Sequence, residues 1–135
     1  MTDEKRFRNN VYHGEVSEHI FQNICFVDHE YTVSKPTSTA DYDLVVDVGD
    51  SVYKVQVKSS RKGNGNANIC KGTGKSKRAY DDGAVDFFAV HDVPHDEWYI
   101  IPKSFTGDIQ NIRLAYKRQG KYSQFKNNWG FKHVP

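Results

Sequence analysis

Two short runs of apolar residues, each marked by polar side chains at fixed positions, constrain the fold of this chain most. The first run occupies residues 43–46 (Asp-Leu-Val-Val), and the second occupies residues 55–58 (Val-Gln-Val-Lys). Side chains two residues apart in a strand point to the same face, so Gln56 and Lys58 share one face and the two valines share the other. Because a Gly-Asp-Ser turn separates the runs, they predict a β-hairpin that brings Asp43 to Gln56 and Lys58 at one edge of a sheet.

An acid, an amide oxygen and a lysine that meet at a sheet edge can hold a hard cation and act on a phosphodiester. A divalent cation bound by oxygen atoms stabilises charge on the phosphate and activates water. Asp43 is the predicted main ligand, with the backbone carbonyl of Val57 and the amide oxygen of Gln56 as neutral ligands. Lys58 is predicted to position the water or to stabilise the transition state. The all-oxygen set favours Mg²⁺, with Mn²⁺ able to substitute.

Each of these residues also has an ordinary structural explanation, and the alternatives stay open at this stage. Asp43 could be a strand-start residue that hydrogen-bonds the preceding loop, and Gln56 and Lys58 could form the solvated face of an amphipathic strand. Asp41 competes with Asp43, because residues two apart can share a face. We prefer Asp43 because it directly precedes the apolar run, and the metal-site hypothesis depends on the residues acting together.

The predicted helix from Val16 to about Asp28 supplies a further acid. Its apolar residues recur at three- and four-residue spacing, as Val16, Ile20, Ile24 and Val27. On this helix Glu18 falls at the flank of the apolar stripe, whereas Glu15 falls on the solvent side. Glu18 is therefore the predicted source of the charge that an amide at position 56 lacks, directly or through a water. An exposed helix acid is the alternative.

The remaining pattern predicts an α/β sandwich with a mixed sheet of four or five strands. A strand-like stretch ends at Pro36, and segment 61–78 is rich in Gly, Asn and Lys and resists a regular assignment. The predicted strands are Tyr31–Lys35, Tyr42–Val48, Val52–Ser59, Val85–His91 and Glu97–Ile101; residues 79–83 favour a short turn or helix, 107–112 are ambiguous, and 123–129 favour a short helix.

The net charge of +2 conceals a strongly uneven distribution of charge. From Lys58 to Arg78, both included, there are seven basic residues and no acid, and six more basic residues follow Asp108, again without an acid. Such asymmetry indicates a polyanionic partner, although a solvated loop and a basic tail would show it too. The predicted DNA contacts, with asparagines reading base edges, are Arg61, Lys62, Asn64, Asn66, Asn68, Lys71, Lys75, Lys77, Arg78, Lys117, Arg118 and Lys121.

The length of 135 residues suits a single domain. No apolar run approaches the roughly 20 residues of a membrane span, and residues 1–6 lack the apolar core of a signal peptide. Cys25 and Cys70 have no metal-site spacing and are predicted to be reduced thiols, with a single disulfide as the alternative. We therefore expect a cytoplasmic protein.

Three segments of the chain resemble the PD-(D/E)XK nuclease superfamily. They are residues 14–18 (Gly-x-x-Ser-Glu), 42–47 (Tyr-Asp-Leu-Val-Val-Asp) and 55–58 (Val-Gln-Val-Lys). More narrowly, they are similar to small group I intron-associated homing endonucleases of cyanobacteria and their phages, in which the second motif ends in Gln-x-Lys. The segments that begin at Tyr80, Trp98 and Tyr122 also resemble that group, so the likeness covers about residues 14–130. Tyr42 stands where the superfamily pattern has proline.

The resemblance implies a fold and a set of site residues. The fold is a restriction-endonuclease-like core with a mixed four- to five-stranded sheet flanked by helices, within a single nuclease domain over residues 1–135. A basic DNA-contacting segment is expected at about 61–78, and a basic C-terminal region at about 113–135. The implied catalytic residues are Glu18, Asp43, Gln56 and Lys58, with Asp43, Val57 and Glu18 at the metal. Asp86 matches a recurring acid, for which we expect a structural role.

The implied function is a site-specific, Mg²⁺-dependent DNA endonuclease of homing type that makes double-strand breaks. A small chain has limited surface for reading DNA, so a homodimer or homotetramer on a pseudo-palindromic duplex site is expected, in the cytoplasm of a bacterial or phage-infected cell. Two alternatives remain. One is a Holliday-junction-resolving or repair nuclease; the other is a catalytically inactive DNA-binding protein on the same scaffold, for which Gln56 is the best support.

Overall fold

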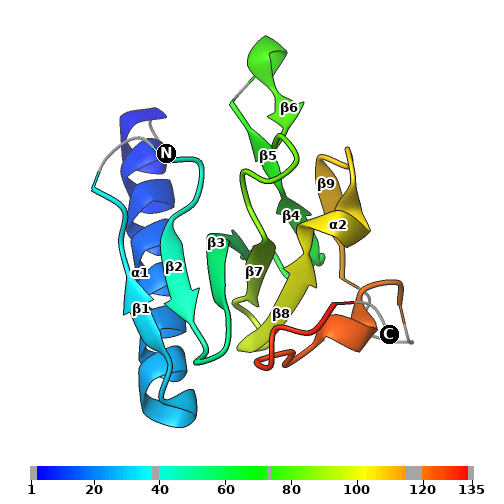
Figure 1. Cartoon of the computed structure of the whole chain (residues 1–135). Coiled ribbons are helices and arrows are strands. Elements are labelled where there is room, and N and C mark those ends of the chain that lie inside the picture. Colours follow the sequence, from blue (N-terminus) through cyan, green and yellow to red (C-terminus); the bar gives the residue numbers. More distant parts are fainter. Residues whose placement is uncertain (1–2, 38–39, 73, 115–119, 134–135) are drawn as a thin grey trace.

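A five-stranded mixed sheet forms the centre of the computed structural model, which describes residues 3–37, 40–72, 74–114 and 120–133 (Figure 1). The strand order is β1-β2-β3-β7-β8, with β3 and β7 parallel and the other neighbours antiparallel. This arrangement confirms the predicted mixed sheet. The strands are β1 (Thr32–Ser34), β2 (Leu44–Asp47), β3 (Val52–Ser60), β7 (Phe87–Asp92) and β8 (Glu97–Pro102).

The predicted hairpin is present, and its register fixes the faces of β3. Leu44 pairs with Val55 across the antiparallel β2–β3 ladder. The turn closes at Gly49, whose φ of 109° is a conformation that only glycine adopts without strain. Val55 and Val57 are buried on one face of β3, while Gln56 and Lys58 on the opposite face are half-buried. The period of two read from the sequence is therefore the one the strand has.

Helix α1 (Asp3–His29) covers the face of the sheet formed by the valines of β3 (Figure 1). It starts earlier than predicted, and in its part from residue 14 onward the buried side chains are Ser17, Phe21 and Cys25. Val27 is 66% exposed, so the predicted apolar stripe was wrong there. The buried face follows the i, i+4, i+8 line through the bulky Phe21, and this line leaves Val27 outside it.

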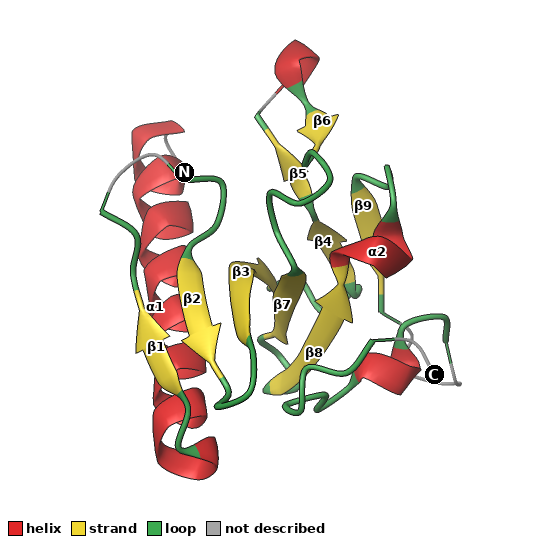
Figure 2. Ribbon diagram, viewed as in Figure 1, coloured by secondary structure: helices red, strands yellow, loops and turns green. Residues whose placement is uncertain are grey.

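The opposite face of the sheet is covered by a two-stranded ribbon rather than by a long helix (Figure 2). The ribbon pairs β4 (Asn66–Asn68) with β9 (Asn111–Arg113). Tyr122 and Phe125, from the C-terminal segment, pack into the same apolar cluster. Phe125 is the last residue of a short 3₁₀ turn, η2 (Ser123–Phe125), where a longer helix was predicted.

Segment 61–78 contains regular structure, although its sequence resisted a regular assignment. Besides β4 it holds β5 (Cys70–Lys71), a 3₁₀ turn η1 (Gly74–Ser76) and the start of β6 (Arg78–Ala79). Strands β5 and β6 form a hairpin that projects from the body of the protein (Figure 1). Two buried apolar side chains in an otherwise polar stretch, Ala67 and Ile69, anchor the segment to the core, and tertiary contacts of this kind override weak local propensity.

The smaller features complete the fold. Helix α2 (Lys103–Thr106) follows β8 directly. Cys25 and Cys70 are both free, in agreement with the predicted reduced thiols, and both are buried. Among the residues that the structure describes, no helix has the length and apolar character needed to cross a membrane.

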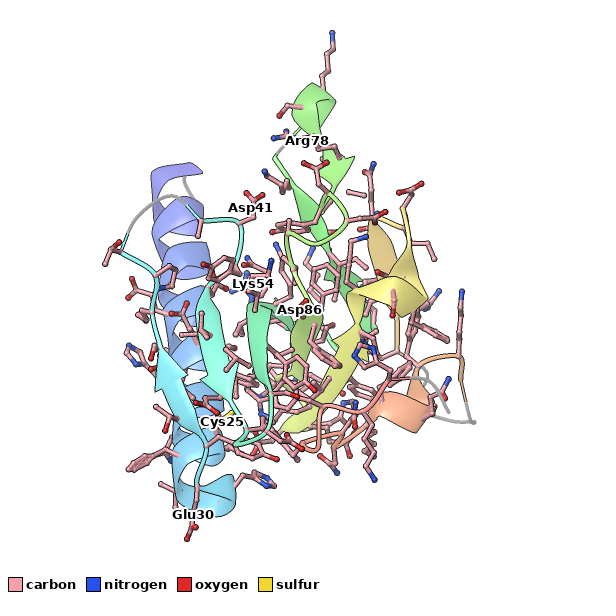
Figure 3. The ribbon with its side chains drawn as sticks, in the orientation of Figure 1. Cys25, Glu30, Asp41, Lys54, Arg78 and Asp86 are labelled. Carbon is pink, nitrogen blue, oxygen red and sulfur yellow. The ribbon has the colours of Figure 1, made fainter. Side chains whose placement is uncertain are left out.

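Asp86 connects the two parallel strands, which gives it the structural role expected of it. Its Oδ2 accepts a hydrogen bond from the backbone N–H of Lys54 at 2.8 Å, and its own N–H donates to the Lys54 carbonyl at 2.8 Å (Figure 3). These bonds stand immediately before the first parallel pair, Val55 with Phe87. The side chain thus satisfies a donor of β3 at the point where the β7 ladder begins.

We expect Asp86→Ala to lower the free energy of unfolding by about 1–3 kcal/mol, the cost of leaving the partly buried N–H of Lys54 unsatisfied. Denaturant unfolding measures this directly. The matched control is Asp81→Ala, because Asp81 is an exposed residue of the neighbouring turn, and its substitution should change stability by less than about 0.5 kcal/mol. Equal effects of the two substitutions would show that the Asp86 bond is unimportant.

Candidate active site

Asp43 lies at the end of the β2–β3 ladder and binds the neighbouring strand through its side chain. Its backbone N–H donates to the Val55 carbonyl at 3.0 Å, and its Oδ2 accepts the N–H of Val57 at 3.0 Å. The carboxylate therefore continues the ladder where the backbone of β2 has ended. The bond goes to β3 rather than to the preceding loop, and it fixes the orientation of the Asp43 carboxylate beside the strand that carries Gln56 and Lys58.

The backbone carbonyl of Val57 lies on the same side of β3 as Asp43. In a β-strand the N–H and C=O of one residue point toward the same neighbour. Because the Val57 N–H donates to Asp43, its carbonyl oxygen is directed to that side as well. The geometry thus brings the predicted carboxylate and carbonyl ligands to one edge.

The environment of Asp43 disfavours its negative charge. Burial raises the pKa of the Asp43 carboxyl above its ordinary value, and the nearby charge of Glu18 raises it further. The hydrogen bond from Val57 and the charges of Lys58 and Lys35 act in the opposite direction. A half-buried carboxylate whose negative charge is poorly solvated is a good partner for a divalent cation.

Lys58 is held over the site by two groups that the sequence did not indicate for this role. Its Nζ donates to the Cys70 carbonyl at 3.4 Å and lies 5.6 Å from the centre of the Tyr80 ring. Burial lowers the pKa of Lys58, partly opposed by Asp43 and Cys70. A lysine with a lowered pKa can accept or donate a proton closer to neutral pH than an exposed lysine can.

Tyr80 lies beside Lys58 in the candidate site. Burial, followed by the charges of Asp43 and Asp41, raises the pKa of its hydroxyl to about 12, so this hydroxyl stays protonated. Tyr80 begins one of the segments that resemble the homing endonucleases, which was the available signal for it. The Cys70 carbonyl is a main-chain atom, and no side-chain pattern could have indicated it.

A hollow of about 340 Å³ brings the predicted polar residues together. Asp43, Gln56 and Lys58 line it, as the hairpin predicted. Asp41 lines it too, at the end of the sheet from which the β5–β6 hairpin projects (Figure 3). Its Oδ1 lies 2.6 Å from the Nζ of Lys71. This ion pair compensates the charge of Asp41, which favours Asp43 as the carboxylate that remains for a cation.

The charge of Glu18 raises the pKa of Asp43, but the Glu18 carboxylate itself forms an ion pair with Lys35. The side chain is 17% exposed, and its Oε1 lies 2.7 Å from the Nζ of Lys35. Glu15 is exposed, in agreement with its predicted solvent position. Lys35 was not singled out from the sequence; its place just after the edge strand β1 and before Pro36 gave no indication of a partner on α1.

The donor set fits a divalent cation. The carboxylate of Asp43, the side-chain oxygen of Gln56 and the carbonyl of Val57 are all oxygen donors, which Mg²⁺ and similar ions prefer. No group of three or more His, Cys, Asp or Glu side chains that could hold a metal is found within the described part of the chain. A cation here would consequently depend on amide and main-chain oxygens, as the sequence suggested.

A second hollow, of about 530 Å³, extends from Lys58 along the basic segment. Lys58 lines both hollows, so the two meet at the candidate catalytic lysine. Residues 14 and 17 of α1 contribute to its wall. Five of the predicted DNA contacts also line it, namely Arg61, Lys62, Asn64, Asn66 and Asn68.

The other predicted DNA contacts lie outside this hollow. Lys71 and Arg78 pair across the β5–β6 hairpin, and exposed Lys75 and Lys77 lie between them. The Nζ of Lys121 lies 5.7 Å from the ring centres of Phe105 and Tyr122. Lys117 and Arg118 fall outside the described residues.

A family model for PD-(D/E)XK endonucleases matches residues 9–134. The chain belongs to the PD-(D/E)XK endonuclease family. It is accordingly a DNA endonuclease, a hydrolase of phosphodiester bonds, and PD-(D/E)XK nucleases generally use divalent metal ions. The resemblance read from residues 14–18, 42–47 and 55–58 is confirmed at the level of the family.

The fold of this PD-(D/E)XK endonuclease is similar to that of a bacterial homing endonuclease, I-Ssp6803I. The match has a TM-score of 0.63 and covers 87% of this chain and 86% of that chain, at 23% sequence identity. A likeness at this identity shows the fold. A comparison with curated protein sequences gives no match.

Proposed function

We propose that this PD-(D/E)XK endonuclease is a site-specific, Mg²⁺-dependent enzyme of homing type that makes double-strand breaks in DNA. One observation carries the proposal: the hollow that unites Asp43, Gln56 and Lys58 meets, at Lys58, a hollow lined by basic and amide side chains. If a DNA phosphate lay at Lys58, the neighbouring nucleotides would lie next to the basic and amide side chains of the second hollow. The fold shared with a bacterial homing endonuclease supports the same proposal.

The reaction that this site supports is attack of a water oxygen on phosphorus, with breakage of one P–O bond and transfer of a proton to the leaving oxygen. A divalent cation, when bound, supplies charge stabilisation on the phosphate and lowers the pKa of water. Asp43 and the Val57 carbonyl would hold it, and Gln56 would contribute an amide oxygen. Lys58 takes the proton from the attacking water or, in its charged form, stabilises the negative charge that develops on the phosphate.

A double-strand break requires two such sites, one for each strand. One chain carries one candidate site, so the enzyme would act as a homodimer or homotetramer whose symmetry matches a pseudo-palindromic duplex target. The measurement that checks this is light scattering of the enzyme with and without duplex DNA. A monomer in both conditions would contradict the paired-site arrangement.

Cleavage of bacterial and phage genomic DNA tests the homing proposal directly. With Mg²⁺ present we expect paired ends that map to one or a few sequences, and chelation of the metal should abolish them. Scattered single-strand nicks without a preferred sequence would overturn site specificity. Preferential cleavage of a four-way junction over linear duplex would assign the enzyme to the junction-resolving class instead.

A second candidate, a catalytically inactive DNA-binding protein, is favoured by the amide at position 56, which brings one negative charge fewer than a carboxylate would.

We expect Gln56→Glu to lower the Mg²⁺ concentration for half-maximal cleavage by about tenfold, since the added carboxylate strengthens cation binding. Gln56→Met, which removes the ligand oxygen at similar size, should raise that concentration. Magnesium titrations of the cleavage rate provide the measurement. Cleavage by Gln56→Glu alone, with none by the wild type, would establish the inactive-scaffold alternative.

A further inference from the structure

We infer that the β4–β9 ribbon is the base-reading surface of this enzyme, with Asn111 and Arg113 acting as specificity-determining residues beside Asn66 and Asn68. The inference rests on the proposed site-specific function, because a non-specific nuclease needs no such surface. Neither residue of β9 stood among the DNA contacts predicted from the sequence. Only the pairing of β4 with β9 reveals them.

The register places four polar side chains on one face of the ribbon. Asn66 lies opposite Arg113, and Asn68 lies opposite Asn111. Both strands show the same alternation, with exposed, buried and exposed residues in turn. The central pair, Ala67 and Ile112, points to the other face and is buried. Side chains at the two ends of each strand therefore point outward together.

The ribbon is a firmly held platform. Ala67 and Ile112 are each 3% exposed and belong to the apolar cluster that covers the central sheet. Backbone bonds close it at both ends: the N–H of Leu114 donates to the Gly65 carbonyl at 2.9 Å, and that of Ile69 donates to the Gln110 carbonyl at 2.9 Å. Precise readout of bases benefits from polar groups on such a regular element rather than on a loop.

Gly65 allows the chain to enter the ribbon at this close spacing. Its φ is 77°, and a Cβ at this position would lie 2.4 Å from the carbonyl oxygen of Leu114. The preceding Asn64 has a local role, because its Oδ1 accepts the N–H of Asn66 at 3.0 Å. Asn64 therefore shapes the turn, whereas Asn66 and Asn68 present their amides from the ribbon itself.

The polar face of the ribbon is continuous with the candidate active site. Asn66 and Asn68 line the same hollow as Lys58 and Ser59. The two stretches that contribute the ribbon, from Lys58 to Arg78 and beyond Asp108, contain no acidic residue. DNA whose phosphate lies at Lys58 would thus reach the ribbon without meeting a negative side chain from either stretch.

The dimensions and side-chain types of the ribbon suit the major groove. A two-stranded ribbon fits a groove about 12 Å wide, where asparagine pairs with adenine and arginine with guanine through two hydrogen bonds each. Alternate residues of a strand are about 6.6–6.8 Å apart, close to two steps of about 3.4 Å along DNA. The geometry predicts adenine opposite the Asn68–Asn111 end, and guanine or adenine two base pairs away, opposite the Asn66–Arg113 end.

The test is cleavage of a randomised duplex library followed by sequencing of the cut products. For Arg113→Ala we expect the guanine preference at one position to fall by about 10- to 100-fold, with other positions unchanged. Arg113→Lys keeps the charge but loses the planar fork, so it should bind DNA well without restoring the guanine preference. Asn111→Ala should relax an adenine preference two base pairs away. Lys62→Ala, a phosphate-type control off the ribbon, should slow cleavage of all sequences alike.

The outcomes separate this inference from the function on which it rests. If the wild type shows a preferred sequence and all ribbon variants retain it at every position, the ribbon is not the reading surface. If the wild type shows no preferred sequence, the proposed site specificity itself fails, and the ribbon inference fails with it. Melting temperatures of the Arg113 and Asn111 variants should match that of the wild type because both side chains are exposed.

Discussion

Asp43→Asn is expected to reduce DNA cleavage by a factor on the order of 10²–10³ or more, because it removes the only full negative charge that we assign to the cation. The same substitution should leave the fold intact. An asparagine side-chain oxygen can still accept the N–H of Val57, the bond that Asp43 makes at 3.0 Å. Cleavage assays on the preferred substrate measure the loss of activity.

The stability of Asp43→Asn provides an independent check with a defined sign. The folded-state pKa of Asp43 is raised, chiefly by burial. Its contribution to stability is therefore fully present below the unfolded pKa of about 3.9 and is lost as the pH rises through the folded value. At neutral pH the ionised carboxylate costs stability, so the variant should be at least as stable as the wild type. Relative to the wild type, the variant should gain stability from acid to neutral pH.

The response to Mg²⁺ distinguishes a role of Asp43 as a cation ligand from a purely structural role. A ligand that binds only the folded state raises its melting temperature, so the wild type should gain thermal stability with Mg²⁺ and Asp43→Asn should gain much less. If the variant were markedly less stable at neutral pH and responded to Mg²⁺ as the wild type does, Asp43 would be a purely structural residue.

Lys58→Met should reduce the cleavage rate by a factor on the order of 10² or more, because Lys58 is assigned to proton transfer or charge stabilisation. DNA binding should be retained. Burial lowers the folded pKa of Lys58, so its charged form costs stability at neutral pH, and the apolar variant should fold normally. Fluorescence anisotropy with labelled duplex, alongside cleavage assays, distinguishes binding from chemistry.

The control for this experiment lies four residues earlier on the same strand. Lys54 donates to the Gly83 carbonyl and lies over the Tyr42 ring, and it does not line the hollow of Asp43. Lys54→Met should change the cleavage rate by no more than a few-fold. A comparable loss in both variants would mean that the general charge of β3, rather than Lys58, supports the reaction.

Lys58→Arg and the pH profile identify which role Lys58 has. An arginine keeps the positive charge but does not release its proton. If Lys58 accepts a proton from water, the arginine variant should be inactive, and wild-type activity should rise with pH toward the lowered pKa of Lys58. Substantial activity in the arginine variant, with a flat profile, would assign Lys58 to charge stabilisation alone.

The central hairpin was predictable because its information is local. The alternation at Val55, Gln56, Val57 and Lys58 encodes the two faces of β3 directly, and a glycine turn sets the pairing with β2. Strands β7 and β8 were likewise read from apolar runs around a polar turn. These elements bring Asp43, Gln56 and Lys58 together, and this part of the candidate site followed from the sequence.

The parts that could not be predicted depend on contacts between distant segments. The pairing of Asn66 with Arg113 joins residues far apart in the chain, and each strand contributes one buried residue in a polar stretch. Similarly, the ion pair between Glu18 and Lys35 joins α1 to the segment after β1. No periodicity within a single segment records such a contact.

The most direct test of the candidate active site is a crystal structure of the enzyme bound to its DNA with Mn²⁺, located by anomalous scattering. We predict an ion about 2.0–2.3 Å from a carboxylate oxygen of Asp43 and from the carbonyl oxygen of Val57, with a DNA phosphate as a further ligand and Lys58 beside it. A metal peak remote from Asp43, with the cleaved phosphate bound elsewhere on the protein, would contradict the account.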